Sequence, residues 1–245
     1  MSDPSRGSIA RWLAVTLPSV ISSLLKPPHI MRRRTTLVRL LMWLAFGLGC
    51  RVSHAVDESS EPPLQYSIAV GDATTIISEG MPVQIKGTFS DPTVTLTPHE
   101  YRVFPYRGIR FRYPRSFTFE ADLAGPQSKT WVLSGNDFKV MYFVLGAPVS
   151  TGQFADSMLD QFGRENARIV DAEAAITLGR ERLVGTSLRV SVGGERLVTD
   201  IYRIPSRDTE ARLLVFQDSL DDAGNRSEEG RRALAEIDSS FTVER

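Results

Sequence analysis

Residues 140–145 read Val-Met-Tyr-Phe-Val-Leu, six apolar side chains in succession with no charge among them. Successive side chains of a β-strand point to opposite faces of its sheet, so a strand that is apolar at every position needs cover on both faces. Residues 213–216, Leu-Leu-Val-Phe, form a second run of this kind. Both runs predict strands inside a sheet that lies between two other layers.

Alternating strands flank these two runs. Between residues 109 and 113, Ile, Phe and Tyr alternate with arginine, which predicts a half-buried strand that ends at Pro114. Residues 188–192 repeat the alternation, and Gly193-Gly194 then supplies the two-residue turn of a β-hairpin. Because hairpins join antiparallel strands, the sheet is predicted to be mostly antiparallel.

Two segments have the periodicity of an α-helix. The first follows a capping residue, Ser150 or Thr151, and ends at Gly163. The second opens with Ser-Glu-Glu at residues 227–229. Their apolar stripes are Phe154, Met158, Leu159 and Phe162 in the first, and Ala233, Leu234 and Ile237 in the second. The predicted fold class is therefore α+β, a sandwich in which two helices cover a mostly antiparallel sheet.

The chain before residue 56 has the pattern of a secretory signal peptide. Met31 precedes four arginines at 32–34 and 39, an uncharged apolar core follows at 40–49, and Ser53-His54-Ala55 resembles a cleavage site. The core is too short to cross a bilayer as a helix. Residues 31–55 are thus predicted to export the protein to the periplasm or the medium of a bacterium.

Two alternatives remain for this end of the chain. Residues 1–30 are an over-called extension if Met31 is the initiator, or else a genuine N-terminal segment. Gly49-Cys50 resembles a lipoprotein cleavage site, so Cys50 is a candidate for lipidation, the one case in which we expect peripheral membrane association.

The rest of the chain divides into three parts. Residues 56–63, acidic and closed by two prolines, are predicted to be a flexible linker. Residues 64–100 form a short β-rich segment, in which alternation at 83–86 and 93–97 around Ser90-Asp91-Pro92 predicts a hairpin. Residues 101–245 form the α/β domain.

Charge argues against nucleic acid as a partner. Of the 29 basic and 29 acidic residues, eight and one lie within residues 1–55, which leaves 21 and 28 in the remainder and a net charge of −7. Phosphate backbones are bound by positive charge.

Residues 106–114, Tyr-Arg-Gly-Ile-Arg-Phe-Arg-Tyr-Pro, and the ending Ile237-Asp-Ser-Ser-Phe-Thr-Val243 resemble the PsbP-like superfamily over residues 101–245. Where that family usually has Gly-Trp after Tyr-Pro, this chain has Arg115-Ser116-Phe117. The resemblance implies an α/β/α sandwich around an antiparallel sheet. It also implies a binding or accessory role, as in envelope proteins of the DcrB type, with no catalytic residue to carry over.

The residues themselves do not indicate a catalytic or metal site. Cys50 is the one cysteine and precedes the predicted cleavage point, and His99 is the one histidine after residue 55. This composition disfavours Cys/His zinc sites and cysteine nucleophiles, and the chain contains no Gly-x-Ser-x-Gly motif. We therefore expect no catalytic, cofactor-binding or metal-binding residues and no enzymatic activity.

The stretch from Tyr101 to Phe117 carries the candidate partner-binding face, made of five arginines: Arg102, Arg107, Arg110, Arg112 and Arg115. Strand alternation alone also places these arginines outside and the aromatic residues inside. The predicted function is an exported, non-catalytic binding or accessory protein whose partner is another envelope protein. The alternatives are a carrier of a small apolar or lipid-like ligand and a small carboxylate- or metal-dependent hydrolase.

Overall fold

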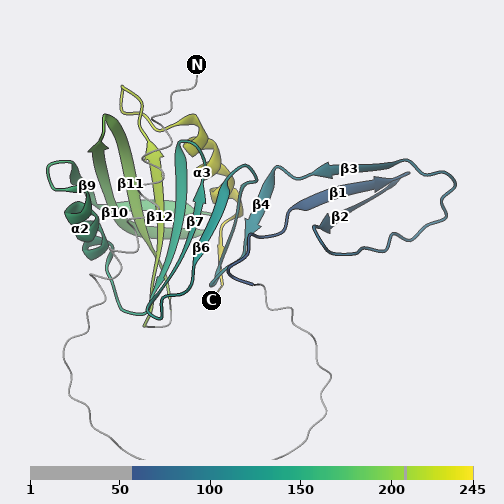
Figure 1. Ribbon diagram of the computed structural model, residues 1–245, viewed down its shortest axis with the longest axis horizontal. Helices are drawn as coiled ribbons and strands as arrows, with labels where there is room; N and C mark the ends of the chain where they lie inside the picture. Colours follow the sequence, from purple (N-terminus) through teal and green to yellow (C-terminus); the bar gives the residue numbers. More distant parts are fainter. Residues whose placement is uncertain (1–56, 207–208, 245) are drawn as a thin grey trace, which may run out of the picture.

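The computed structural model describes residues 57–206 and 209–244, and its largest element is a seven-stranded sheet (Figure 1). The strands follow the order β6-β7-β8-β12-β11-β10-β9, and all neighbouring pairs are antiparallel. They are β6 (Thr118–Asp122), β7 (Ser128–Ser134), β8 (Phe138–Leu145), β9 (Ala167–Leu178), β10 (Glu181–Val192), β11 (Glu195–Ile204) and β12 (Ala211–Ser219). The predicted α+β class with a mostly antiparallel sheet and two helices is confirmed.

The two uncharged apolar runs lie in β8 and β12, which are neighbours inside the sheet. Every residue of β8 is buried. Tyr142 belongs to the hydrophobic core on one face of the sheet, and the next residue, Phe143, belongs to the core on the other. The prediction that these strands are covered on both faces is confirmed.

Different elements cover the two faces. On one face α2 (Thr151–Phe162) packs against β9, β10 and β11. On the other lie α3 (Glu228–Ser240) and a small sheet of order β13-β5-β4, formed by Thr242–Val243, Ile109–Pro114 and Tyr101–Phe104. One face of β5 packs into the core on this side of the large sheet, so Ile109, Phe111 and Tyr113 are buried. The other face carries Arg110 and Arg112, which are exposed.

Both helices begin at the residues that the sequence indicates. Ser150 caps α2 by accepting a hydrogen bond from the amide of Gln153, whose side chain accepts one from the Ser150 amide. This reciprocal pair is a capping box. Ser227 caps α3 through the amide of Gly230. At the end of α2, Gly163 has a φ of 84°, a left-handed value that favours glycine.

Residues 57–63, which lie in the predicted linker, form a strap that contacts the domain. The indole Nε1 of Trp131 donates to the carbonyl oxygen of Glu58 at 2.8 Å, and the Tyr106 hydroxyl donates to that of Ser60 at 2.6 Å. Trp131 and Tyr106 are both buried, and a buried polar group needs a partner. Burial and the carboxylates of the strap raise the pKa of Tyr106 to about 12, so the hydroxyl keeps its proton.

Residues 65–98 form a β arm that projects from the rest of the molecule (Figure 1). It is a separate three-stranded sheet of order β2-β1-β3, made of β1 (Gln65–Val70), β2 (Ala73–Ser78) and β3 (Val94–Pro98). The predicted pairing of 83–86 with 93–97 is wrong. Residues 79–93, which include 83–86, form no strand and connect β2 to β3. β1 and β2 form a hairpin around Gly71-Asp72, and β3 pairs with the other edge of β1.

Neither described helix is long and apolar enough to span a membrane.

A close backbone approach in the large sheet leads to a prediction about Gly185 in β10. This residue stands beside a register shift between β9 and β10, where a Cβ would overlap the carbonyl oxygen of Ile201. A backbone atom inside a sheet cannot move aside, so Gly185→Ala should lower the free energy of unfolding by about 2–3 kcal/mol in urea denaturation. As the control, Gly152→Ala in the first turn of α2, where a Cβ has room, should leave stability unchanged or raise it by less than ~1 kcal/mol. Equal effects of the two changes would contradict the prediction.

Candidate functional site

One face of the β arm is formed almost entirely by apolar side chains. The register places three cross-strand rows on this face: Ile77-Tyr66-Pro98, Thr75-Ile68-Leu96 and Ala73-Val70-Val94. We call these nine residues the arm face. None of them is charged. Seven of the nine are aliphatic or aromatic, and the other two are Pro98 and Thr75.

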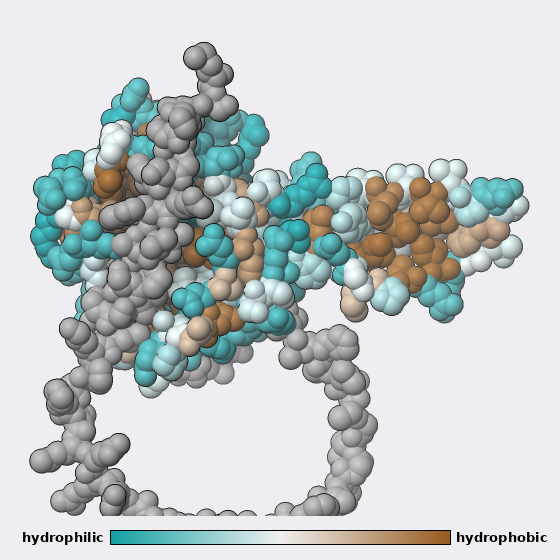
Figure 2. Space-filling model, viewed as in Figure 1, coloured by the Kyte–Doolittle hydropathy of each residue, from teal (hydrophilic) through white to brown (hydrophobic). Residues whose placement is uncertain are grey.

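The opposite face of the arm is mostly polar. It carries Gln65, Ser67, Ser78 and several threonines, with Ile76 and Ala69 as the apolar members. A sheet with one apolar and one polar face normally buries the apolar one against a second layer. In the arm Val94 and Leu96 are 55% and 53% exposed. Figure 2 shows the resulting brown patch over β1, β2 and β3.

The outer edges of the arm are also open. β2 and β3 are the edge strands of the arm, and neither pairs with a further strand among the described residues. Edge strands present free backbone amide and carbonyl groups that can pair with another chain. The arm therefore offers a partner two things together, an uncharged apolar face and two strand edges.

The five arginines of the predicted partner-binding face do not share one environment. Arg102 and Arg107 bind the strap through Glu61 at 3.3 Å and Glu58 at 3.0 Å. Arg112 binds Glu236 of α3 at 2.5 Å. The remaining two, Arg110 and Arg115, are exposed and form no ion pair with a described residue. Three of the five thus hold neighbouring elements of the fold together.

His99 lies at the base of the arm and not in a cluster of titratable groups. Its Nε2 is 3.0 Å from the Ser67 hydroxyl, and its backbone amide donates to the carbonyl of Gln65. Within residues 57–206 and 209–244 no group of three or more His, Cys, Asp or Glu side chains is arranged to hold a metal ion. Cys50 and the predicted signal peptide lie outside the described residues.

A buried network of two carboxylates and an arginine escaped prediction. Asp200 in β11 and Asp218 in β12 are both buried on the α3 side of the sheet. Arg226 lies 2.5 Å from Asp200 and 3.9 Å from Asp218. The signal for Asp200 is an acidic residue in the mostly apolar run 197–204, at a position that alternation places on the same face as Tyr202 and Ile204.

This network anchors the start of α3. Asp218 Oδ1 accepts hydrogen bonds from the Ser227 hydroxyl at 2.6 Å and the Ser227 amide at 3.3 Å, and Ser227 in turn caps the helix. A Cβ on Gly230 would overlap the Asp218 carboxylate, so the helix approaches this closely because glycine stands there. Burial raises the pKa of Asp218, while the Ser227 hydrogen bonds and Arg226 act in the opposite direction.

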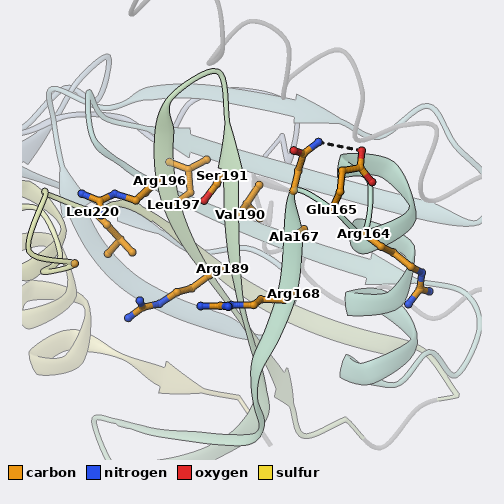
Figure 3. A pocket seen from close by; sticks show the side chains of 12 residues that line it. Arg164, Glu165, Ala167, Arg168, Arg189, Val190, Ser191, Arg196, Leu197 and Leu220 are labelled. Atoms are coloured by element: carbon orange, nitrogen blue, oxygen red, sulfur yellow. Dashed lines mark hydrogen bonds between the residues drawn. The ribbon is translucent and has the colours of Figure 1, made fainter.

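A cavity of about 390 Å³ lies where β9 begins and β10 ends, beside the loop after α2 (Figure 3). Its lining includes four arginines: Arg164, Arg168, Arg189 and Arg196. An apolar ligand carrier needs a predominantly apolar cavity, and this lining is strongly cationic. The cavity therefore does not favour the carrier hypothesis.

No family model and no curated protein matches this chain. Among solved structures, LpqN of Mycobacterium tuberculosis, described as involved in cell envelope biogenesis, is 17% identical over 60% of this chain and 93% of its own, with a TM-score of 0.37. A protein from Bacteroides thetaiotaomicron VPI-5482 is 11% identical over 60% of this chain and 48% of its own, with a TM-score of 0.34. At these TM-scores neither likeness supports an inference about this chain.

The raised pKa of Asp218 predicts a pH dependence of stability. Because the pKa of Asp218 is higher in the folded protein than in the unfolded chain, this carboxyl lowers the free energy of unfolding as the pH rises from its ordinary pKa through the folded one. Asp218→Asn removes that titration. The stability of the wild type relative to this variant should therefore fall with rising pH in urea denaturation series.

Asp221→Asn in the following loop is the control with the opposite sign. Hydrogen bonds from Asn225 lower the pKa of Asp221, so the stability of the wild type relative to this variant should rise with rising pH. A wild-type advantage over Asp218→Asn that stays constant or grows with pH would show that burial does not dominate at Asp218.

Proposed function

We propose that this protein is an exported, non-catalytic accessory protein that binds another protein outside the cytoplasm through the arm face. The observation that carries the proposal is that Val94 and Leu96 are more than half exposed on the uncharged, mostly apolar arm face of a projecting arm. Exposed apolar patches on soluble domains mark sites of interaction. Export is proposed from the basic and apolar pattern of residues 31–55.

The chemistry of the arm favours a protein over a lipid surface. Residues 64–98 contain three carboxylates, Asp72, Glu79 and Asp91, against one lysine, Lys86. Segments that bind anionic membranes are rich in Lys and Arg, because the membrane surface is negatively charged. The partner we expect presents an uncharged apolar surface, with an extended strand that can pair with β2 or β3.

The arm face alone is too small to hold two copies of the chain together in a stable dimer. Three strands of about six residues cover a flat area of roughly 20 by 14 Å, or about 280 Å². Two such faces together fall well below the roughly 1,200–2,000 Å² that stable interfaces bury. A stable complex therefore needs contacts beyond the arm face, and the open strand edges supply them for a partner of different shape.

The PsbP-like sandwich remains part of this proposal. It is supported by the antiparallel sheet with α3 on one face and α2 on the other, and by the aromatic strand β5 that ends at Pro114. The non-catalytic role is supported by the network around Asp218, in which each group holds another part of the fold.

A photo-crosslinking experiment on the two faces of one strand tests the proposal. A photoreactive side chain at position 96 lies on the arm face, and one at position 95 lies on the opposite face of the same strand. In cells that produce the full-length protein, position 96 should yield a defined adduct with one other protein, and position 95 should not. Val94→Asp with Leu96→Asp should reduce binding of that protein more than ~10-fold, because a buried charge is costly.

The matched control is Thr95→Asp with Thr97→Asp, which adds the same charge to the polar face and should leave binding unchanged. Equal crosslinking from positions 95 and 96, an adduct with the mass of two copies of this chain, or an adduct with lipid would each contradict the proposed partner.

A further inference from the structure

Two arginines stand directly opposite each other at one end of the large sheet. Arg168 at the start of β9 and Arg189 near the end of β10 are cross-strand partners in the register. Both side chains are exposed and line the 390 Å³ cavity. Like charges directly opposite each other destabilise an antiparallel pair, so the fold itself gains nothing from this arrangement.

Neither of these two arginines has a partner in the part of the chain that the structure describes. No ion pair or hydrogen bond joins the Arg168 or Arg189 guanidinium to another side chain in residues 57–206 and 209–244. The other two arginines of the cavity are paired: Arg164 with Asp160 at 2.9 Å and Arg196 with Asp222 at 2.9 Å. The unpaired positive charges of the cavity are thus those of Arg168 and Arg189, and the one carboxylate of the lining, Glu165, accepts a hydrogen bond from the Asn166 side chain.

The side chains point in a common direction. Figure 3 shows Arg168, Arg189 and Arg196 leaving neighbouring strands toward the same side, whereas Arg164 points away from them. The Arg189 guanidinium extends to the loop around Gly224, where a Cβ would lie 3.9 Å from its Nη1. Ser191, on the same face of β10 two residues along, adds an exposed hydroxyl to the lining.

We propose that Arg168 and Arg189 form a binding site for the phosphate group of a small phosphorylated ligand, with Arg196 at its rim. Two guanidinium groups offer parallel N–H donors that match the oxygens of phosphate. A phosphate monoester carries close to two negative charges at neutral pH, which balances two arginines better than a single carboxylate does. A volume of about 390 Å³ is within the range of small-molecule sites and leaves room for more than the phosphate itself.

The site differs from the arm face in position and in chemistry. It lies on β9 and β10 of the large sheet and is cationic, whereas the arm face lies on β1–β3 and is uncharged. The proposed phosphate site therefore does not depend on the proposed partner interface, and an experiment that contradicts one leaves the other unaffected.

Thermal unfolding in inorganic phosphate tests the site. At constant pH and ionic strength, ~10 mM phosphate should raise the Tm of the wild type by about 3–6 °C if the Kd is near 1 mM, relative to chloride. Arg168→Gln with Arg189→Gln should abolish this rise. The control, Arg110→Gln with Arg115→Gln, removes the same charge from two exposed arginines outside the cavity and should keep it.

Two results of this thermal-unfolding experiment would overturn the proposal. One is an equal phosphate effect in the cavity variant and the wild type, and the other is an equal effect of chloride and phosphate at matched ionic strength. Calorimetric titration of the wild type with phosphate provides the second readout, and it should show heat of binding that the cavity variant lacks.

The source of the phosphate group is distinguished by a second pair of probes. Phosphoserine and glycerol 3-phosphate represent soluble esters, and phosphatidylcholine vesicles that contain phosphatidic acid represent a lipid headgroup. Competition of glycerol 3-phosphate with inorganic phosphate, without binding to vesicles, indicates a soluble ligand. Sedimentation with the vesicles that Arg168→Gln with Arg189→Gln abolishes indicates a lipid headgroup, and failure of all these probes would contradict the site.

The repulsion between the two arginines gives an independent test without any ligand. Arg189→Glu converts the like-charge pair into an opposite-charge pair with Arg168, so it should raise the Tm of the ligand-free protein by about 1–3 °C while it eliminates the phosphate effect. The same change at Arg110, which has no arginine opposite it, should not raise the Tm. A fall in Tm with Arg189→Glu would show that the pair is not repulsive, and would contradict the basis of the site.

Discussion

Burial of β8 and β12 on both faces is the constraint on which this architecture depends. Each of these strands places large apolar side chains alternately above and below the sheet, so each face needs its own cover. The chain supplies that cover from sequence-distant segments, with α2 on one side and α3 with β4, β5 and β13 on the other. The helices and the small sheet therefore belong to the same packed unit as the central strands.

Buried polar groups in the core on the α3 side of the sheet form the hydrogen bonds that hold the strap and α3. The indole of Trp131 and the hydroxyl of Tyr106 are buried with the aromatic cluster, and the carbonyl groups of the strap satisfy them. On the same side of the sheet Asp218 reaches the cap of α3 through Ser227. The strap and α3 are thus held by hydrogen bonds from buried residues, and α3 also by the apolar packing of Ala233 and Ile237.

The elements that follow from local periodicity could be predicted, and those that follow from pairing at a distance could not. The apolar runs, both helix starts, Gly163 and the Gly193-Gly194 turn are each specified by neighbouring residues. The pairing of β3 with β1 depends instead on competition between strands, which alternation at 83–86 does not reveal. The same holds for the candidate sites. Alternation correctly directed the arginines of β5 outward, but the ion pairs of Arg102, Arg107 and Arg112 and the meeting of Arg168 with Arg189 depend on tertiary register.

Function is best sought where the residues work against the stability of the fold. Most exposed positions of the large domain are polar, and many of its arginines form ion pairs, as is usual for a solvent-exposed protein surface. The arm face and the Arg168–Arg189 pair are departures with opposite chemistry: one leaves apolar side chains in water, and the other places two positive charges side by side. Either arrangement costs free energy in the isolated protein and is relieved when a complementary surface or ion binds. The arm face and the Arg168–Arg189 pair are for this reason the two places in the described structure where a bound molecule should be sought first.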